Sequence, residues 1–220
     1  ISFGNGLFNY YAIWVAEEYP LLKPIIRLFP KGDKKLGISQ LDNAAKNSFY
    51  TRTEAQFFLM KILSQENNIS RSFQLSNYLS DLFPNNSIFH GVNNSLLYRS
   101  GRFNECEKES LIIIENFKNN KYGYKHNLVR QAAFFLGEIY SSKSEIELSK
   151  KYYNESIEMA KIIDAEKMGY TLHSYFSLGK YAFNENDYFS AKKYFNKVIK
   201  LTKRSEKINI DSRIFIKKMR

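Results

Sequence analysis

The side chains best suited to catalysis or metal binding are few and widely separated. None of the three histidines, His90, His126 and His173, has a carboxylate or a second histidine at the spacing of a metal site. The single cysteine, Cys106, has no histidine or pair of basic residues at a spacing that would activate a thiolate. Gly4-Asn5-Gly6 lacks the preceding strand and the third glycine of a nucleotide loop, so we expect close helix packing there instead.

Other chemical signatures are also missing. No serine stands in a Gly-x-Ser-x-Gly elbow, and the sequence contains no Gly-Lys-Ser/Thr phosphate loop. Glu105, Glu107 and Glu109 lie at an expected helix start, where negative charge favours the helix dipole. One cysteine excludes a disulfide framework and a zinc site built from cysteines. The sequence therefore predicts a protein that is not an enzyme and needs no cofactor or metal.

Composition narrows the class of protein further. The chain has 220 residues with 4 Pro, 10 Gly and 16% aromatic residues, which excludes disordered and collagen-like chains. No apolar run approaches the ~18 residues of a membrane span. The net charge of +11 raises the question of an anionic partner.

The elements that position these residues are expected to be helices. Apolar residues recur at helical spacing in blocks near 57–63, 75–82, 134–140 and 194–201. Short polar turns such as 184–187 separate the blocks, and sustained two-residue alternation is absent. Helix pairs joined by short turns, and repeated, indicate an α-solenoid.

Small and large residues repeat in a fixed order along these helices. The order is clearest at Leu178, Gly179, Ala191 and Phe195, and it recurs at Leu136, Gly137, Ser149 and Tyr153. This pattern resembles the tetratricopeptide repeat family, whose units have about 34 residues. The resemblance implies an all-α fold, an α-solenoid of antiparallel helix pairs wound into a right-handed superhelix.

Counting from these positions divides the chain into degenerate units. We predict a solenoid over 1–205, with units near 18–52, 53–86, 87–120, 130–163 and 172–205. Pro20 and Pro24 would lie in the first helix of the first unit, near its start or at a kink. Cys106 falls at a small position of the third unit, so we expect it to be buried.

A second resemblance concerns the N-terminal part of the chain. Residues 3–9 with Gly32-Asp33 and residues 37–41 resemble the opening of inclusion-clearance and mitochondrial outer-membrane tetratricopeptide proteins. Tetratricopeptide proteins of Bacteroidetes share such a Gly-Asp turn. The chain begins at Ile1 within an apolar stretch, which predicts a natural N-terminus further upstream. The cytoplasm and a bacterial periplasm or envelope both stay open as compartments.

The family resemblance also implies a binding surface. In this family the first helix of each unit lines a concave groove. Carried onto these units, the groove would present Glu54, Phe57, Lys61, Gln65, Tyr98, Arg99, Gln131, Phe134, Glu138, His173, Phe176, Lys180 and Asn184. Aromatic and cationic side chains suit a peptide or protein segment. Phe57, Phe134 and Phe176 have an alternative role, packing between neighbouring helices.

The net charge is concentrated at the C-terminal end. From Lys200 to Arg220 there are eight basic and two acidic residues. Residues 206–220 are predicted to form a basic amphipathic helix or tail, which either caps the last repeat or contacts an anionic partner. The residues of such a contact would be Lys203, Arg204, Lys207, Arg213, Lys217 and Lys218.

Three functions follow from these features. The first is a non-catalytic interaction module or scaffold that binds a protein or peptide in the groove. The second is an assembly factor that uses the basic C-terminal helix at an envelope or anionic membrane surface. A nucleic-acid-binding solenoid comes third, and nucleic acid is disfavoured because the groove and sheet signatures of such proteins are missing.

Overall fold

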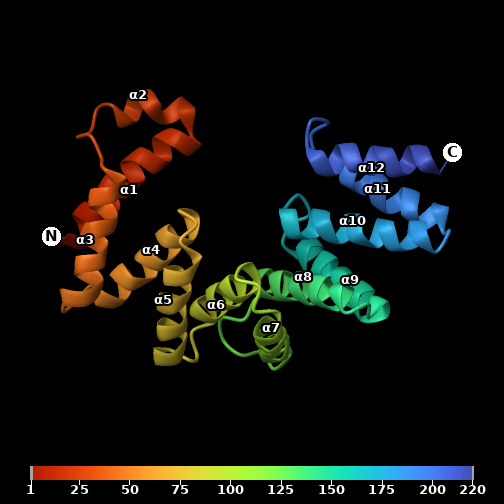
Figure 1. The fold of residues 1–220 in the computed structure, drawn as a ribbon, viewed down its shortest axis with the longest axis horizontal. Helices are drawn as coiled ribbons and strands as arrows, with labels where there is room; N and C mark the ends of the chain where they lie inside the picture. The colour runs from red at the N-terminus through yellow and green to blue at the C-terminus, as the bar shows by residue number, and fades with distance from the viewer. Residues whose placement is uncertain (1, 220) are drawn as a thin grey trace. The chain divides into compact units, whose positions relative to one another are not determined.

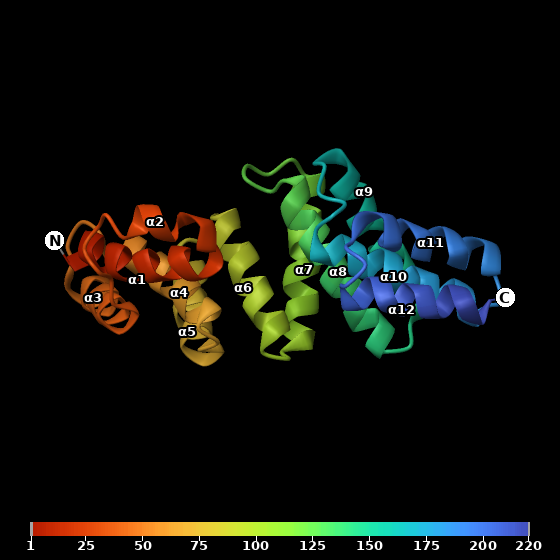
Figure 2. The ribbon, with the colours of Figure 1, turned by 90° about the horizontal axis from the view of Figure 1, so that it is seen from above.

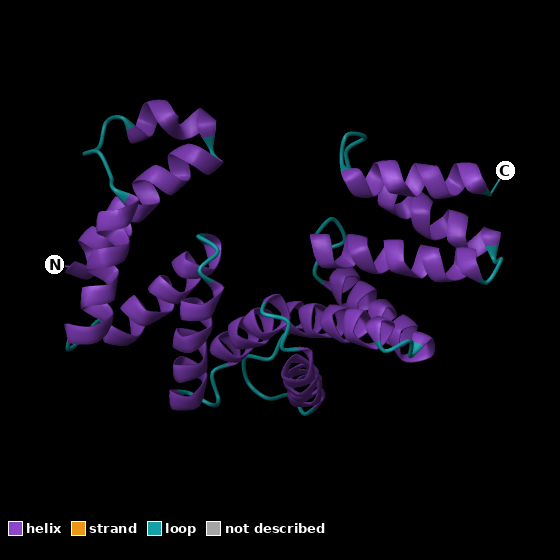
Figure 3. Cartoon of the chain, in the orientation of Figure 1, coloured by secondary structure: helices purple, strands orange, loops and turns teal. Residues whose placement is uncertain are grey.

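The regular structure is entirely helical in residues 2–219, the part of the chain that the computed structural model describes (Figures 1 and 3). The elements are α1 (Ser2–Glu18), η1 (Pro20–Leu22), α2 (Lys23–Ile26), α3 (Lys34–Asn47), α4 (Arg52–Gln65), α5 (Ile69–Leu82), α6 (Ser87–Arg99), α7 (Phe103–Lys118), α8 (His126–Ser142), α9 (Ile146–Ile162), α10 (Gly169–Asn184), α11 (Tyr188–Leu201) and α12 (Lys207–Lys218). The predicted all-α solenoid of consecutive helix pairs is confirmed.

The helices form two compact units, Ile1–Ser100 and Gly101–Arg220. In the first unit α1 pairs with α3, α3 packs on α4, α4 on α5 and α5 on α6. In the second unit α7 packs on α8, α8 pairs with α9, α10 pairs with α11, and α12 lies over α11 and α10 (Figure 1). The predicted repeat at 87–120 therefore spans the boundary between the two units.

The first helix pair differs from the sequence prediction. The partner of α3 is α1, whereas Pro20 and Pro24 lie in the connection, each at the start of a short helical turn. Proline favours a helix start and disrupts a helix interior, which keeps both segments short. Asp33 then begins α3 by accepting a hydrogen bond from the Leu36 amide at 3.0 Å.

The pair of α1 and α3 depends on a close backbone approach. A Cβ added to Gly37 would lie 2.7 Å from the Tyr10 amide nitrogen, and one added to Gly6 would lie 2.8 Å from Leu41 Cγ. Only glycine leaves room for this contact. The packing role expected for the glycines at the N-terminus is confirmed for Gly6, whereas Gly4 has no heavy atom within 4 Å of its added Cβ.

The later helix pairs use one arrangement of small and large residues. A Cβ on Gly137 would lie 2.6 Å from the ring of Tyr153, and one on Gly179 would lie 2.8 Å from the ring of Phe195. Each aromatic residue follows its glycine by the same number of positions, so the two contacts are equivalent. The ring of the second helix rests directly on the backbone of the first.

Buried serines form hydrogen bonds between the two helices of a pair. The Ser72 hydroxyl donates to the carbonyl of Met60 at 2.7 Å, and the Ser149 hydroxyl donates to the carbonyl of Gly137 at the same distance. Both serines are 0% exposed. They thus combine a small volume with a hydrogen bond between the two helices of a pair.

Cys106 is also a small buried residue. Its side chain is 0% exposed. Burial raises the pKa of the Cys106 thiol to about 12, so the nucleophilic thiolate is scarce at neutral pH. The structural role expected for this residue is confirmed.

Four three-residue turns between consecutive helices share a left-handed residue. Asn67, Gly101, Ser144 and Asn186 have φ values of 60°, 74°, 62° and 60°. In three of these turns the amide of the next residue donates back to the preceding helix, as when the Glu145 amide donates to the carbonyl of Tyr140 at 2.9 Å. The repeat is therefore visible in the turns even where its sequence is degenerate.

One surface segment of the first unit is strongly apolar. Leu21 and Leu28 are 93% and 84% exposed, within the connection between α1 and α3.

In the described part of the chain, no helix combines the length and hydropathy that crossing a membrane requires.

Candidate peptide-binding face

The groove residues predicted on the first unit lie on α4 and α6. Glu54, Lys61 and Gln65 are exposed on α4. The Arg99 guanidinium of α6 donates to the hydroxyl and to the carbonyl of Ser64, so it ties the ends of these two helices together. Arg99 is therefore partly a structural residue, although its side chain lies at the surface.

Phe57 and Tyr98 of the same unit are half-buried. The Phe57 ring lies 5.7 Å from that of Phe89, and the Lys61 ammonium lies over it at 5.4 Å. Phe57 thus packs toward α6, as its alternative role required. Phe57 is therefore a half-buried ring beside an exposed cation, Lys61.

On the second unit the predicted residues are brought together by α8 and α10, which lie beside each other (Figure 2). Four polar side chains reach the surface there, and we call this set the α8–α10 face: Gln131, His173, Lys180 and Asn184. His173, Lys180 and Asn184 are exposed, whereas Gln131 is half-buried.

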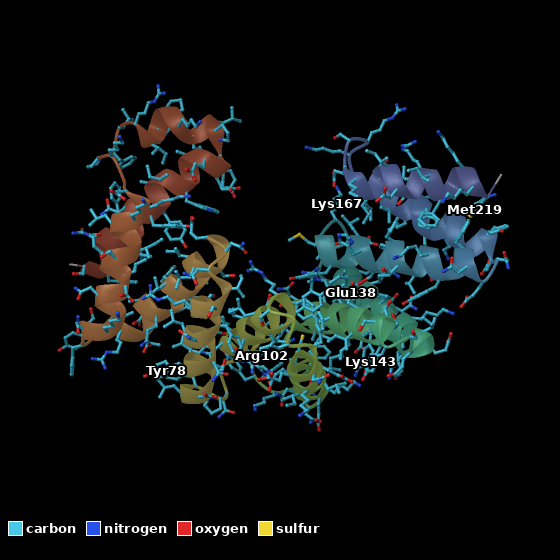
Figure 4. All side chains as sticks on the ribbon, viewed as in Figure 1. Tyr78, Arg102, Glu138, Lys143, Lys167 and Met219 are labelled. Carbon is cyan, nitrogen blue, oxygen red and sulfur yellow. The ribbon has the colours of Figure 1, made fainter. Side chains whose placement is uncertain are left out.

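The other three predicted residues of this unit have partners within the fold. Phe134 is 6% exposed and stacks near Tyr170, with the ring centroids 5.0 Å apart. Phe176 contacts the rings of Phe195 and Phe215. Glu138, marked on α8 in Figure 4, accepts a hydrogen bond from the Tyr153 hydroxyl. The packing role that the sequence offered as an alternative is thus observed for both phenylalanines, which buries Phe134 and leaves Phe176 half-buried.

Tyr170 is a residue of this face that the sequence prediction missed. Its hydroxyl accepts a hydrogen bond from Gln131 Nε2 at 3.1 Å, and its ring lies over Phe134. Tyr170 precedes His173 by one helical turn in α10, and that spacing was the available signal. Its ring forms an aromatic floor between α8 and α10.

Arg130 lies beneath this floor and was also missed. The residue is only 5% exposed, and its guanidinium faces the Tyr170 ring at 5.4 Å. Its Nη2 donates to Asn127 at 2.9 Å, while Nε and Nη1 have no hydrogen-bond partner among the described residues. Burial lowers the pKa of Arg130, because the cation has lost its water without gaining a counter-charge.

The C-terminal helix covers the end of the last pair. The Phe215 ring of α12 stacks on Phe195 at 4.9 Å and meets Phe183 at 5.2 Å. The six residues predicted for a basic contact are all exposed, and none forms an ion pair with another described residue: Lys203, Arg204, Lys207, Arg213, Lys217 and Lys218. The apolar side of α12 is thus used for packing, while its charges remain at the surface.

The described residues offer no group of three His, Cys, Asp or Glu side chains arranged to hold a metal ion. This region presents polar side chains and the Lys180 cation on two neighbouring first helices, α8 and α10. Consecutive antiparallel pairs that expose such a face define a helical-repeat protein of the class that binds other proteins.

Comparison with known proteins identifies the repeat. A family model described as tetratricopeptide repeat matches residues 131–162 and 172–204, which fall on the pairs α8–α9 and α10–α11. Two units of the chain, 131–162 and 172–204, are thus matched as tetratricopeptide repeats. No curated protein matches it.

Two solved structures are similar in fold. BtubC (BKLC) from P. vanneervenii is 14% identical and has a TM-score of 0.59, covering 83% of this chain and 78% of that one. The MamA RS-1 ArsTM double mutant is 13% identical and has a TM-score of 0.60, covering 90% and 93%. These likenesses show the fold alone. The N-terminal resemblance to inclusion-clearance proteins stays a prediction.

Proposed function

We propose that this protein is a non-catalytic scaffold that captures a peptide or protein segment on the first helices of its repeats. Tetratricopeptide repeats in general support protein interaction. The observation that carries the proposal for this chain is the α8–α10 face, which lies on the two pairs that match the family. Three of its four polar groups are exposed, next to the packed rings of Phe134 and Tyr170.

The chemistry of the face favours a particular kind of segment. Lys180 and His173 offer an ammonium group and an imidazole, and Gln131 and Asn184 offer amides for the backbone of a ligand. Since Phe134 and Phe176 are used within the fold, recognition depends on polar contacts more than on deep aromatic pockets. We expect a segment that carries carboxylates.

A displayed library of random peptides, selected on the purified chain, tests this proposal. We expect the enriched peptides to be acidic, and the double substitution Lys180→Glu with His173→Ala to weaken their binding about tenfold or more. Lys192→Glu is the matched control, because Lys192 is exposed on α11, a second helix. An equal loss in the control, or no loss in the double variant, would show that the peptides bind elsewhere.

A second candidate function rests on the unpaired cations near the C-terminus. Six exposed basic residues on and before α12 suit an anionic membrane surface, the role of an envelope-associated assembly factor. Sedimentation with vesicles of phosphatidylserine, against vesicles of phosphatidylcholine, tests it. We expect binding only to the anionic vesicles, with a steep dependence on salt. Stronger binding to duplex DNA than to those vesicles would favour the third, nucleic-acid-binding function instead.

A further inference from the structure

The second unit contains a cavity away from the α8–α10 face. Its volume is about 450 Å³, within the range of pockets that hold small ligands. It opens between α9, α10 and α11, and ten residues line it: Asn154, Ile157, Glu158, Lys161, Tyr175, Lys193, Tyr194, Asn196, Lys197 and Lys200. Nine of these residues lie on the second helices α9 and α11, so a ligand here would not compete for the first-helix surface.

Two of the four lysines in the cavity have counter-charges. Lys161 pairs with Glu158 at 2.7 Å, and Lys197 pairs with Glu166 at 2.8 Å. Lys193 and Lys200 have no ion pair within the described chain, and they lie two turns apart on α11. The cavity therefore has two cations in excess.

The cavity also has an apolar wall, formed by Ile157, Tyr175 and Tyr194. Ile157 and Tyr175 are 3% and 6% exposed, and the rings of Tyr175 and Tyr194 lie 6.4 Å apart. The Tyr175 hydroxyl donates to Glu166 at 2.8 Å, and this same carboxylate holds Lys197. The wall is thus fixed before any ligand arrives, which reduces the entropy lost on binding.

We propose that this cavity binds a small organic phosphate, a phosphate monoester on a ring or another apolar body. Lysine ammonium groups attract a phosphate as point charges, and a phosphate monoester carries close to two negative charges near neutral pH. That charge matches the two unpaired lysines, Lys193 and Lys200. The apolar wall of Ile157, Tyr175 and Tyr194 would receive the body of the ligand. The proposal does not depend on peptide capture by the α8–α10 face.

Titration calorimetry with three probes tests the proposal. Phenyl phosphate carries both the charge and the ring, inorganic phosphate carries the charge alone, and benzyl alcohol carries the ring alone. We expect phenyl phosphate to bind at least about tenfold more tightly than either fragment. Equal affinities for phenyl phosphate and inorganic phosphate would overturn the proposal, since they would indicate an adventitious ion only.

Charge variants distinguish the cavity from general attraction to a basic protein. The double substitution Lys193→Gln with Lys200→Gln should weaken phenyl phosphate binding about tenfold or more. The single substitution Lys192→Gln is the matched control, because Lys192 is an exposed neighbour on α11 that does not line the cavity. The control should change the affinity less than about twofold. An equal loss in the control, or no saturable binding by the native chain, would overturn the proposal.

Discussion

The packing of Gly137 against Tyr153 makes a sharp prediction about stability. The substitution Gly137→Ala would place a methyl group 2.6 Å from Cδ1 and Cε1 of the Tyr153 ring. Carbon atoms in contact normally lie ~3.5–4.0 Å apart, so the ring must move by about 1 Å. Tyr153 is 1% exposed and its hydroxyl is held by Glu138, which leaves the ring little freedom to move.

The magnitude follows from two opposing effects. Overpacking a core costs about 1–3 kcal/mol, and replacing a helical glycine by alanine returns about 1 kcal/mol. Because the Tyr153 ring is both buried and hydrogen-bonded, we expect the cost to lie toward the upper end. The net loss is then about 1–2 kcal/mol, equivalent to a fall of about 2–8 °C in the unfolding temperature of a chain of this size.

Thermal and urea unfolding, followed by circular dichroism, measure this loss. Gly4→Ala is the control, because Gly4 is an exposed helical glycine with open space around its added Cβ. It should stabilise by about 0.5–1 kcal/mol. The additional substitution Tyr153→Leu should reduce the cost of the alanine at position 137. If Gly137→Ala stabilised the chain as Gly4→Ala does, the proposed role of glycine in the helix pair would be refuted.

Four further predictions concern single side chains. Arg130→Met should leave stability unchanged or raise it by about 1 kcal/mol in urea unfolding, because it removes a buried cation that has no counter-charge; a loss above ~2 kcal/mol would contradict this. Ser144→Gly should raise stability by about 0.5–1 kcal/mol, because its φ of 62° strains any residue with a Cβ, and an unchanged midpoint would count against that strain. Hydrogen bonds from Lys197 and Tyr175 lower the pKa of Glu166, so the stability that Glu166 contributes should be present above the unfolded pKa of about 4.3 and be lost as the pH falls through the folded pKa. Glu166→Gln should therefore flatten the fall in unfolding temperature below about pH 5. An unaltered pH profile would refute the assignment. Leu21→Ser should change the unfolding free energy by less than about 0.5 kcal/mol, because this side chain is 93% exposed, and a larger loss would show that the segment is covered in solution.

The local order of residue sizes was readable from the sequence. The size order of Gly179 and Phe195 lies within one helix pair, so it could be read from the sequence, and the structure places this ring on the first helix. The same holds for Gly137 with Tyr153, and for the small buried Cys106. Helical periodicity and short turns are local properties, and for this reason the all-α fold followed from them.

Which helices pair with each other was harder to predict from the sequence. The sequence predicted that the helix containing Pro20 and Pro24 would pair with the next helix. In the structure α3 packs on α1 instead, because Gly6 and Gly37 let the two backbones approach. A contact between residues 31 positions apart leaves no periodic trace in the sequence. The first helix pair could therefore be assigned only from its packing in the fold.

The roles of individual side chains depended on the tertiary structure still more. The sequence by itself indicated a helical repeat protein with units that resemble tetratricopeptide repeats, rich in aromatic residues and basic toward its end. Only the fold decided that Phe134 and Phe176 are packing residues, that Arg130 is a buried cation, and that Lys193 and Lys200 stand unpaired in a cavity. Whether a side chain faces a ligand, a neighbour or water depends on which helices lie opposite it, and those helices come from distant parts of the chain.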